Sequence, residues 1–425
     1  MVNFLSMQYK IGMINIIYKI QMYYPTVTNI KLASHRLLRI IQRTPFELNK
    51  QLSATYSANI YLKREDLTPV RSYKIRGAFN KMSTMANTES IVSCSAGNHA
   101  QGVAFSCQHL KIAGTIFMPT TTPQQKINRV KQIGRDYARI ILEGTNFDQS
   151  FHAAKKYSLT TKEAFIHPFD DEKVIEGQGT VGLEIMEQTP TLLDYIILPI
   201  GGGGLAAGVS AYIKEVSPKT KIIGVEPLGA PSMNEALKQK KVVTLENITT
   251  FVDGASVKRV GELNFPICQK NLDDVLLIDE GHVCSKILQF YNDHGLIIEP
   301  AGVLSLCALD ILSPSLKGKN VVSIVSGGNS DVFRMPEIME RSLVYEGLKH
   351  YFKIEFPQKP GALKEFIMTV LGKDDDIIYF RYTNIINKET GPVILGLQLK
   401  HKDDIIRILE NMNKMGIVYE RIQNA

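Results

Sequence analysis

Short apolar runs rich in β-branched residues alternate with helical stretches between residues 50 and 340. A strand that is apolar on both faces and is followed by a helix is typical of a parallel sheet that helices cover on both sides. The runs that we interpret as strands are residues 60–62, 91–93, 115–118, 195–199, 222–225, 275–278 and 321–325. The pattern therefore predicts an α/β domain built from βαβ units around a mostly parallel sheet.

The residues before this region have a different character. Residues 1–24 are rich in Ile, Asn, Tyr and Met and contain no acidic residue. They show neither the cleavage site of a secretory signal nor the arginines of a mitochondrial presequence, so we interpret them as an N-terminal extension. An amphipathic helix is predicted from residue 31 to the Thr44-Pro45 pair. Its apolar face is expected to carry Leu32, His35, Leu38 and Ile41.

The pattern changes again after a charged connecting helix, which we predict over residues 333–348. Beyond it, strands are expected at residues 351–356, 377–382, 393–399 and 417–419, and helices are expected to start at Ala362 and near Asp403. This βαββαβ order is that of a small α+β module. We therefore divide the chain into an extension (1–24), an α/β domain (25–340) and a small C-terminal domain (345–425).

Composition and charge narrow the classes of protein to which the chain can belong. Of its 425 residues, 44% are apolar and 21% are charged, as in ordinary globular proteins, and no apolar run is long enough to span a bilayer. Most of the net charge of +7 lies in residues 1–46, which hold six basic residues and no acid, so we expect no nucleic-acid-binding face. Five cysteines without a Cys-x-x-Cys pair favour a reducing cytoplasm over a disulfide framework or a cysteine zinc site.

Four consecutive glycines, 201–204, stand between a predicted strand and a helix that starts near Leu205. Glycines let several backbone N–H groups converge at a helix N-terminus, where the helix dipole favours an anion such as a phosphate. A P-loop is excluded, because Val209-Ser210 follows Gly208 where that motif needs a lysine. Two interpretations remain open at this point, namely a dinucleotide site with Glu226 as its acidic residue and a cofactor with a single phosphate, such as pyridoxal phosphate.

Lys74 lies in the segment Ser-Tyr-Lys-Ile-Arg-Gly-Ala, residues 72–78, where it is predicted to open a helix. A cation is disfavoured at a helix N-terminus, so the position lowers the pKa of the lysine. A lysine with a lowered pKa is suited to Schiff-base chemistry.

This segment resembles the Schiff-base lysine motif of pyridoxal-phosphate (PLP) enzymes with the tryptophan-synthase β-subunit fold, also called PLP fold type II. Three further segments agree with that family in the same order, namely Ser95 to Gln101, the tetraglycine loop and Ser326 to Asn329. From about Thr26 to its C-terminus, the chain is similar to biosynthetic threonine dehydratases (threonine ammonia-lyases).

The resemblance implies pyridoxal 5'-phosphate as cofactor and assigns roles to individual residues. Lys74 would attach the cofactor covalently, Asn98 would hydrogen-bond its ring hydroxyl, and Ser326 would face its pyridine nitrogen. The phosphate would be held by Gly201, Gly202, Gly203, Gly204 and Leu205. The carboxylate of the substrate would be held by Ser95, Ala96, Gly97, Asn98 and His99.

The same resemblance implies the dehydration and deamination of L-threonine to 2-oxobutanoate and ammonia, the first step of isoleucine synthesis, and of L-serine to pyruvate. Because a neutral hydroxyl at Ser326 leaves the ring nitrogen largely unprotonated, loss of a β-substituent is favoured over transamination. Ala96 stands where related racemases have a second serine, so racemisation is not expected. Ser232 stands where those relatives have a metal-binding Asp, so no metal site is expected.

The C-terminal domain resembles the ACT-like regulatory domains of threonine dehydratases in its segment from Phe356 to Leu363. The resemblance implies isoleucine as an inhibitor, valine as its opponent, and a homo-oligomer that is a dimer or a tetramer. A merely structural or dimer-forming module is the alternative for this domain. For the whole chain, a β-replacement enzyme of the same fold and a nicotinamide-dependent oxidoreductase stay open.

Overall fold

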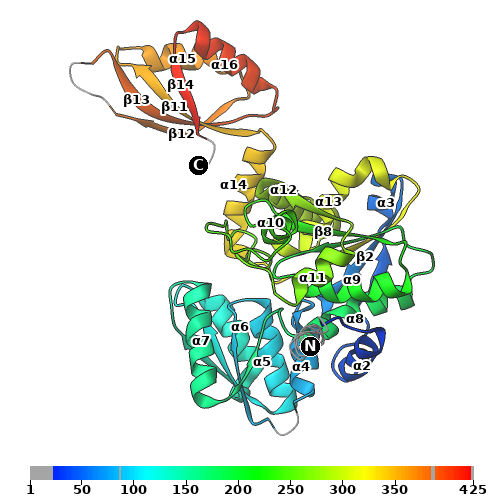
Figure 1. Cartoon of the computed structure of the whole chain (residues 1–425). Helices are drawn as coiled ribbons and strands as arrows, with labels where there is room; N and C mark the ends of the chain where they lie inside the picture. Colours follow the sequence, from blue (N-terminus) through cyan, green and yellow to red (C-terminus); the bar gives the residue numbers. More distant parts are fainter. Residues whose placement is uncertain (1–22, 86–87, 384–387, 423–425) are drawn as a thin grey trace, which may run out of the picture. The chain divides into compact units, whose positions relative to one another are not determined.

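The computed structural model describes residues 23–85, 88–383 and 388–422 (Figure 1). The chain folds into two compact units. The first unit runs to Ile278 and takes up Ile298–Asn329 again, and the second contains Asp279–Ile297 and the chain from Ser330 onward. Apart from Tyr23 and Tyr24, the predicted extension lies outside the described residues.

The first unit contains a six-stranded sheet in which all strands but one run parallel. In spatial order the strands are β1 (Phe46–Leu48), β2 (Asn59–Arg64), β10 (Asn320–Val325), β7 (Tyr195–Pro199), β8 (Lys221–Pro227) and β9 (Asp274–Ile278). Strand β1 is an antiparallel edge strand that the apolar pattern did not predict. Helix α13 (Pro300–Leu316) packs on strands β7 to β10, and α9 (Gly204–Val216) packs on β7. The predicted mostly parallel sheet with helical cover is confirmed.

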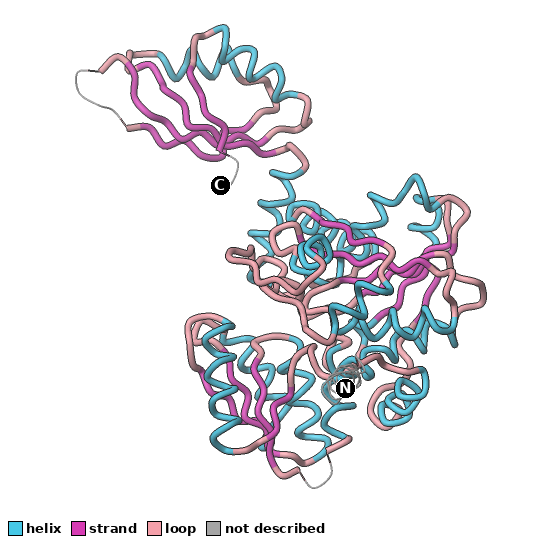
Figure 2. The backbone as a smooth tube through the Cα atoms, in the orientation of Figure 1, coloured by secondary structure: helices cyan, strands magenta, loops and turns pink. Residues whose placement is uncertain are grey.

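A second, four-stranded sheet of the first unit is wholly parallel. Its strands in spatial order are β5 (Ala138–Leu142), β4 (Ala113–Met118), β3 (Ser90–Cys94) and β6 (Ala164–Ile166). Helices α5 (Asn98–Leu110), α6 (Gln124–Gly134) and α7 (Phe147–Thr161) pack around this sheet (Figure 2). The sequence pattern predicted one sheet and missed β5 and β6, because β5 has no fully buried residue and β6 is only three residues long.

The first helix of the described chain differs from the prediction in both its start and its buried face. Helix α2 (Val27–Leu37) begins four residues earlier, because the Thr26 hydroxyl accepts a hydrogen bond from the Asn29 N–H and caps it. The predicted apolar positions Leu32 and Leu38 are 49% and 59% exposed. The buried positions are Ile30, Ala33 and Leu37. This face packs on α8 (Glu172–Gln188), and that tertiary contact, rather than the count of apolar residues, selects the buried side.

Other short elements complete the first unit. They are α3 (Lys50–Tyr56), η1 (Glu65–Leu67), α4 (Lys74–Ser83), η2 (Arg135–Tyr137), α10 (Ser232–Gln239) and α11 (Asn264–Asn271). Helix α4 begins at Lys74, as predicted. Between α10 and α11 the chain forms neither helix nor strand.

The second unit contains the predicted βαββαβ module. Its elements in chain order are β11 (Lys349–Pro357), α15 (Ala362–Val370), β12 (Asp376–Tyr382), β13 (Thr390–Gln398), α16 (Asp404–Lys414) and β14 (Val418–Ile422). The strands form an antiparallel sheet in the order β12-β13-β11-β14. A buried cluster that includes Phe352, Phe366 and Ile408 joins the sheet to both helices. The α+β class of this module is confirmed.

The same unit also holds η3 (Val332–Arg334) and the helix pair α12 (Glu280–His294) and α14 (Met335–Tyr345). Helix α14 lies within the predicted connecting helix of residues 333–348. The two helices are packed together, and the rings of His282 and Tyr345 stack at 5.5 Å. In the described part of the chain, no helix combines the length and the apolar character needed to cross a membrane.

Candidate active site

A pocket of the first unit brings together positions that the sequence singled out in four separate segments. Its lining includes Lys74, Asn98, Gly201 and Ser326. Lys74 and Asn98 each begin a helix, Gly201 follows β7, and Ser326 follows β10. Ligands of open α/β sheets bind where several strands end and helices begin, so this is the place where a ligand is expected.

Lys74 combines partial burial with few partners. Its Nζ lies 3.2 Å from the carbonyl oxygen of Pro168, and among the described residues no carboxylate forms an ion pair with it. Burial lowers the pKa of Lys74 to about 8, an effect that the carboxylate of Glu299 opposes. The predicted direction of the pKa shift is confirmed, and burial is its main cause. At neutral pH a useful fraction of this amine is therefore an uncharged nucleophile.

The backbone on either side of the pocket holds Lys74 next to Ser326. Ser72 forms an antiparallel bridge with Gly327, and the Tyr73 N–H donates to the Ser326 carbonyl at 3.1 Å. The Ser326 hydroxyl donates to the carbonyl of Ala301 at 3.3 Å. Strands β2 and β10 are parallel neighbours, so the segments that follow them lie side by side. One of these segments carries Lys74 and the other carries Ser326.

Asn98 is held from both ends of its side-chain amide. Its Nδ2 donates to Glu299 Oε1 at 2.7 Å, and its Oδ1 accepts from Asn329 Nδ2 at 2.7 Å. Asn329 Nδ2 also donates to the carbonyl of Val70 at 2.8 Å. With both ends engaged, the orientation of the Asn98 amide is determined before any ligand arrives.

Glu299 also lines this pocket. It stands at the N-cap of α13, yet its side chain makes no capping hydrogen bond and reaches Asn98 instead. Burial, with a further contribution from the charge of Asp253, raises the pKa of Glu299 to about 7. The signal in the sequence was an acid beside Pro300 in the segment Glu-Pro-Ala-Gly, which is also an ordinary helix start.

The tetraglycine loop has no room for side chains. A Cβ on Gly202 would lie 2.3 Å from the ring of Phe169, and Gly203 adopts a φ of +93°. The Gly202 carbonyl accepts hydrogen bonds from the Gly261 N–H at 3.0 Å and from Asn264 Nδ2 at 2.8 Å. In a trans peptide the next N–H points the opposite way, so these bonds also orient the Gly203 N–H. Together with the N-terminal N–H groups of α9, the loop forms a cradle suited to a phosphate.

Two backbone N–H groups of the predicted substrate loop already have hydrogen-bond acceptors within the protein. The Ser95 N–H donates to the Phe117 carbonyl at 3.1 Å, and the Gly97 N–H donates to the Ser95 hydroxyl at 3.2 Å. His99 is buried, its Nε2 lies 3.1 Å from the Ile166 carbonyl, and burial lowers its pKa to about 3. Ser95, Ala96, Gly97 and His99 lie next to the pocket through Asn98 but are not part of its lining.

Glu226, the acidic residue of the dinucleotide interpretation, is occupied elsewhere. It is fully buried, and its carboxylate accepts hydrogen bonds from the N–H groups of Met233 at 2.7 Å and Asn234 at 2.9 Å. It therefore caps the start of α10 and presents no free oxygen to a ribose. This contact argues against the dinucleotide interpretation.

Two pocket residues were missed altogether, namely Gly254 and Ala255. A Cβ on Gly201 would lie 3.1 Å from the Ala255 carbonyl oxygen, so this segment lies directly against the glycine loop. The only signal in the sequence was a long stretch without helix or strand pattern between residues 240 and 263, a kind of segment that is often functional.

The residues of the pocket fit a phosphate-bearing aldehyde cofactor. A Cβ at any of Gly201–Gly204 would come within 3.1 Å of a neighbouring protein atom, so only glycines allow this loop. The amine of Lys74 is desolvated and has no carboxylate partner in the described chain. Such an amine is suited to bond with an aldehyde, while the cradle holds the phosphate.

Comparisons with known proteins agree with this chemistry. The sequence profile described as pyridoxal-phosphate dependent enzyme matches residues 37–327, and the profile described as C-terminal regulatory domain of threonine dehydratase matches residues 340–425. The biosynthetic L-threonine dehydratase IlvA of Halalkalibacterium halodurans is 53% identical over 93% of this chain and 96% of its own length. The enzyme of the same name from Bacillus subtilis is 48% identical over 93% of this chain and 94% of its own.

The chain belongs to the threonine dehydratase family of pyridoxal-phosphate-dependent enzymes. Solved structures of such enzymes share its fold. The processed form of threonine deaminase isoform 2 from Solanum lycopersicum matches with a TM-score of 0.70 and 37% identity, covering 75% of this chain and 95% of that one. Maize serine racemase matches with a TM-score of 0.70 and 30% identity, covering 76% and 99%. The predicted PLP fold type II domain, followed by an α+β regulatory module, is confirmed.

Proposed function

We propose that the chain converts L-threonine to 2-oxobutanoate and ammonia, and L-serine to pyruvate, as the first step of isoleucine synthesis in the cytoplasm. The names of its relatives support threonine as the substrate. The observation that carries the proposal is the position of Lys74, a desolvated amine with a pKa of about 8 that lines the same pocket as Gly201 of the glycine loop.

The residues that would hold the cofactor come from the pocket and from the glycine loop that borders it. Lys74 would attach pyridoxal 5'-phosphate covalently, Asn98 and Ser326 would lie at its ring, and residues Gly201, Gly202, Gly203, Gly204 and Leu205 would hold its phosphate. When bound, the cofactor supplies an electron sink for the charge that develops at the substrate Cα. The fixed amide of Asn98 supports this assignment, because Glu299 and Asn329 hold it in one orientation.

The residues of the chain perform the proton transfers. Lys74 would remove the proton from the substrate Cα, and its pKa of about 8 suits an amine that must be uncharged to accept it. Ser326 is a neutral hydroxyl, so it would not hold a proton on the ring nitrogen of the cofactor. The amides near Ala96, Asn98 and His99 bind the carboxylate of the substrate, and Ser95 and Gly97 shape the loop.

We further propose a catalytic domain over residues 25–340 and a regulatory domain over residues 345–425 that responds to isoleucine as inhibitor and to valine as its opponent. We propose a homo-oligomer, a dimer or a tetramer, as the working form. The regulatory-domain profile over residues 340–425 supports the assignment of the second domain.

The first experiment is a visible spectrum of the purified protein followed by an assay with L-threonine alone. A band near ~410–420 nm is expected for the covalently attached cofactor, together with release of 2-oxobutanoate. A β-replacement enzyme would release little 2-oxobutanoate without an added nucleophile. A nicotinamide-dependent enzyme would show no such band, and either result would overturn the proposal.

The regulatory assignment has its own test. A chain that ends at Tyr345 keeps α14 and its packing on α12, so it should retain dehydratase activity and lose the response to isoleucine. Equal inhibition of the full-length and the shortened enzyme would place isoleucine at the active site instead. A full-length enzyme that does not respond would indicate a structural module.

A further inference from the structure

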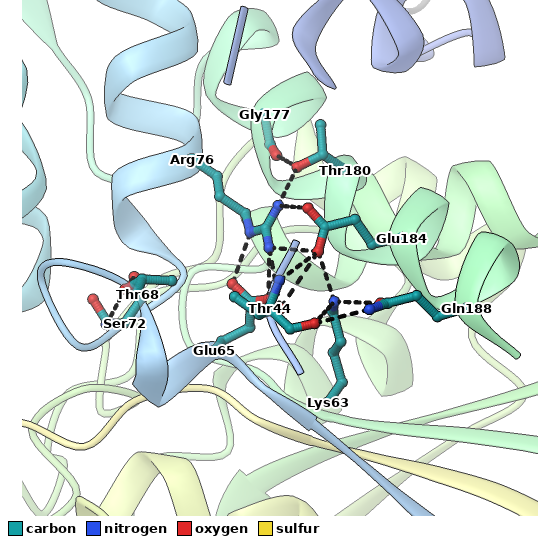
Figure 3. Close-up of polar contacts among 10 residues, drawn as sticks. All are labelled: Thr44, Lys63, Glu65, Thr68, Ser72, Arg76, Gly177, Thr180, Glu184 and Gln188. Atoms are coloured by element: carbon teal, nitrogen blue, oxygen red, sulfur yellow. Dashed lines mark hydrogen bonds and ion pairs between the residues drawn. The ribbon is translucent and has the colours of Figure 1, made fainter. Parts of the chain in front are cut away.

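A second cluster of charged side chains surrounds Arg76, which lies two residues after Lys74 on helix α4. Residues two positions apart on a helix differ by about 200° and face opposite sides, so Arg76 points away from the pocket that Lys74 enters. Arg76 is fully buried, as are Lys63 of β2 and Glu65 of η1, and Glu184 of α8 is 6% exposed. Figure 3 shows these four side chains converging from four separate elements.

Every polar hydrogen of the Arg76 guanidinium has an acceptor. Nε and Nη2 donate to the two oxygens of Glu65 at 2.7 and 2.8 Å, and Nη1 and Nη2 donate to the two oxygens of Glu184 at 2.6 and 2.9 Å. The remaining Nη1 hydrogen reaches the hydroxyl of Thr180 at 3.1 Å. A planar fork that grips two carboxylates determines direction as well as distance, which a lysine cannot do.

Lys63 completes the charge balance of this cluster. Its Nζ donates to Glu184 Oε2 at 2.6 Å, to the Thr44 carbonyl at 2.9 Å and to Gln188 Oε1 at 2.8 Å. Two cations therefore face two carboxylates, and all three ammonium hydrogens are used. We name the set Lys63, Glu65, Arg76 and Glu184 the buried tetrad.

Backbone contact reinforces the tetrad at the same place. A Cβ on Gly177 of α8 would lie 2.6 Å from the Arg76 carbonyl oxygen and 2.7 Å from the Cα of Gly77. Helices α4 and α8 therefore touch through their main chains one turn from Lys74. Strand β2, which carries Lys63, pairs with β10, and β10 leads to Ser326 in the pocket.

The energetics of buried ion pairs point to a role beyond stability. Replacing such a set by well-packed apolar residues is often neutral or stabilising, because desolvation of the charges offsets their attraction. What the tetrad supplies is a single position for the start of α4. We propose that Arg76 is a positioning residue that holds the first turn of α4 against β2 and α8 and thereby aims the amine of Lys74 into the pocket.

This inference rests on the proposed function for its kinetic consequence. A displacement of about 1 Å from a residue remote from the chemistry can cost about a hundredfold in rate. In the described chain no hydrogen bond or ion pair joins Arg76 to the glycine loop or to the segment from Ser95 to His99. Its loss should therefore affect the step performed by Lys74 and spare substrate binding. We expect Arg76→Lys, which keeps the charge but loses the fork, to lower kcat about tenfold to a hundredfold and to leave KM for L-threonine within about twofold of wild type.

A second readout does not depend on activity. In the cofactor-free protein, the rate at which an amine-modifying reagent labels Lys74 can be followed by mass spectrometry over a range of pH. In wild type the labelling should rise through a pKa of about 8. In Arg76→Lys the midpoint should move toward the ordinary value for lysine, because a displaced amine is better solvated. If the wild-type protein proved inactive on threonine, this measurement would still test the positioning.

Two further variants separate positioning from folding. Arg76→Met with Glu184→Met removes one cation and one carboxylate, leaves Lys63 and Glu65 as opposite charges, and should fold while showing the same kcat loss and labelling shift. Arg43→Met removes an exposed ion pair with Glu187 on the same helix α8 and should change neither. A folded Arg76→Lys or double variant with wild-type kcat and wild-type labelling of Lys74 would overturn the proposal. Failure of both variants to fold would also overturn it, because the tetrad would then be a requirement of folding.

Discussion

Lys74 and Arg76 lie two residues apart on one helix, and the structure treats their charges in opposite ways. Burial would lower the pKa of Arg76, but the carboxylates of Glu65 and Glu184 outweigh it and raise the value. Burial also lowers the pKa of Lys74, and there only the distant carboxylate of Glu299 opposes it, so the value falls to about 8. The guanidinium of Arg76 is fully hydrogen-bonded, whereas the amine of Lys74 has, among the described residues, one carbonyl acceptor and the Tyr73 ring at 5.2 Å.

The difference separates a group used for geometry from a group used for chemistry. A guanidinium with every N–H engaged has one orientation and no reactivity. An amine without a carboxylate partner is poorly stabilised as a cation and is therefore available as a nucleophile and a base. Arg76 and Lys74 lie on the same helix, so the fixed orientation of Arg76 can determine where the amine of Lys74 points.

The largest expected effect comes from removing the amine of Lys74. Lys74→Ala should reduce turnover of L-threonine to below about a hundredth of the wild-type value, because it removes both the covalent attachment and the proton acceptor. The band near ~410–420 nm should be lost as well. The matched control is Lys81→Ala on the same helix, which breaks an ion pair with Asp171 and should keep activity. Turnover well above that limit would show that another group is the base.

The next effect is on the free energy of unfolding and comes from removing the guanidinium of Arg76 from its ion pairs. Arg76→Met alone leaves the carboxylates of Glu65 and Glu184 buried without their shared cation. We expect the free energy of unfolding to fall by about 3–5 kcal/mol, the usual range when one partner of a buried ion pair is lost. Urea denaturation measures this, with Arg43→Met as a control expected to stay within about 1 kcal/mol. A loss as small as that of the control would mean that the tetrad relaxes around the missing charge.

The corresponding substitution at Lys74 should have the opposite effect on the free energy of unfolding. Lys74→Met in the cofactor-free protein should raise the free energy of unfolding by about 1–2 kcal/mol, because a desolvated amine is replaced by an apolar side chain. The folded-state pKa of Lys74 is lowered to about 8, so the unfolded chain binds more protons above that pH. The advantage of the variant should therefore be full below pH 8 and shrink as the pH rises further. A destabilised variant at pH 7 would contradict the contrast between the two faces.

A stability effect that appears only above a certain pH is expected at Glu299, which lines the pocket. Its folded-state pKa is raised to about 7, so the wild-type protein loses stability as the pH rises from about 4.5 to 7, where only the unfolded chain releases the proton. Glu299→Gln keeps an oxygen for the Asn98 amide and removes this loss. The variant should gain at most about 3 kcal/mol above pH 7 and nothing below about pH 4.5. Equal pH profiles of stability for wild type and variant would show that Glu299 is ionised at neutral pH.

Local signals predicted much of the fold and part of the candidate site. The strand Tyr195–Pro199, the start of α4 at Lys74 and the order of the C-terminal module all follow from short-range patterns, because strand and helix periods repeat within a few residues. The prediction of the buried face of α2 was wrong, because packing on α8 determines that face and the Thr26 cap determines where the helix starts. The division into two sheets was missed together with β5 and β6, since β5 has no fully buried residue and β6 is only three residues long.

The sequence by itself determined which residues could carry the chemistry, namely a lysine at a helix start, a run of glycines and a neutral serine after a strand. Only the tertiary structure decided their environments. The low pKa of Lys74 comes from burial by surrounding elements, the raised pKa of Glu299 from burial and from Asp253, and the satisfied charge of Arg76 from Glu65 and Glu184. Charge and solvation depend on distances between elements that are far apart in the chain, and the pattern of residues along the chain does not contain those distances.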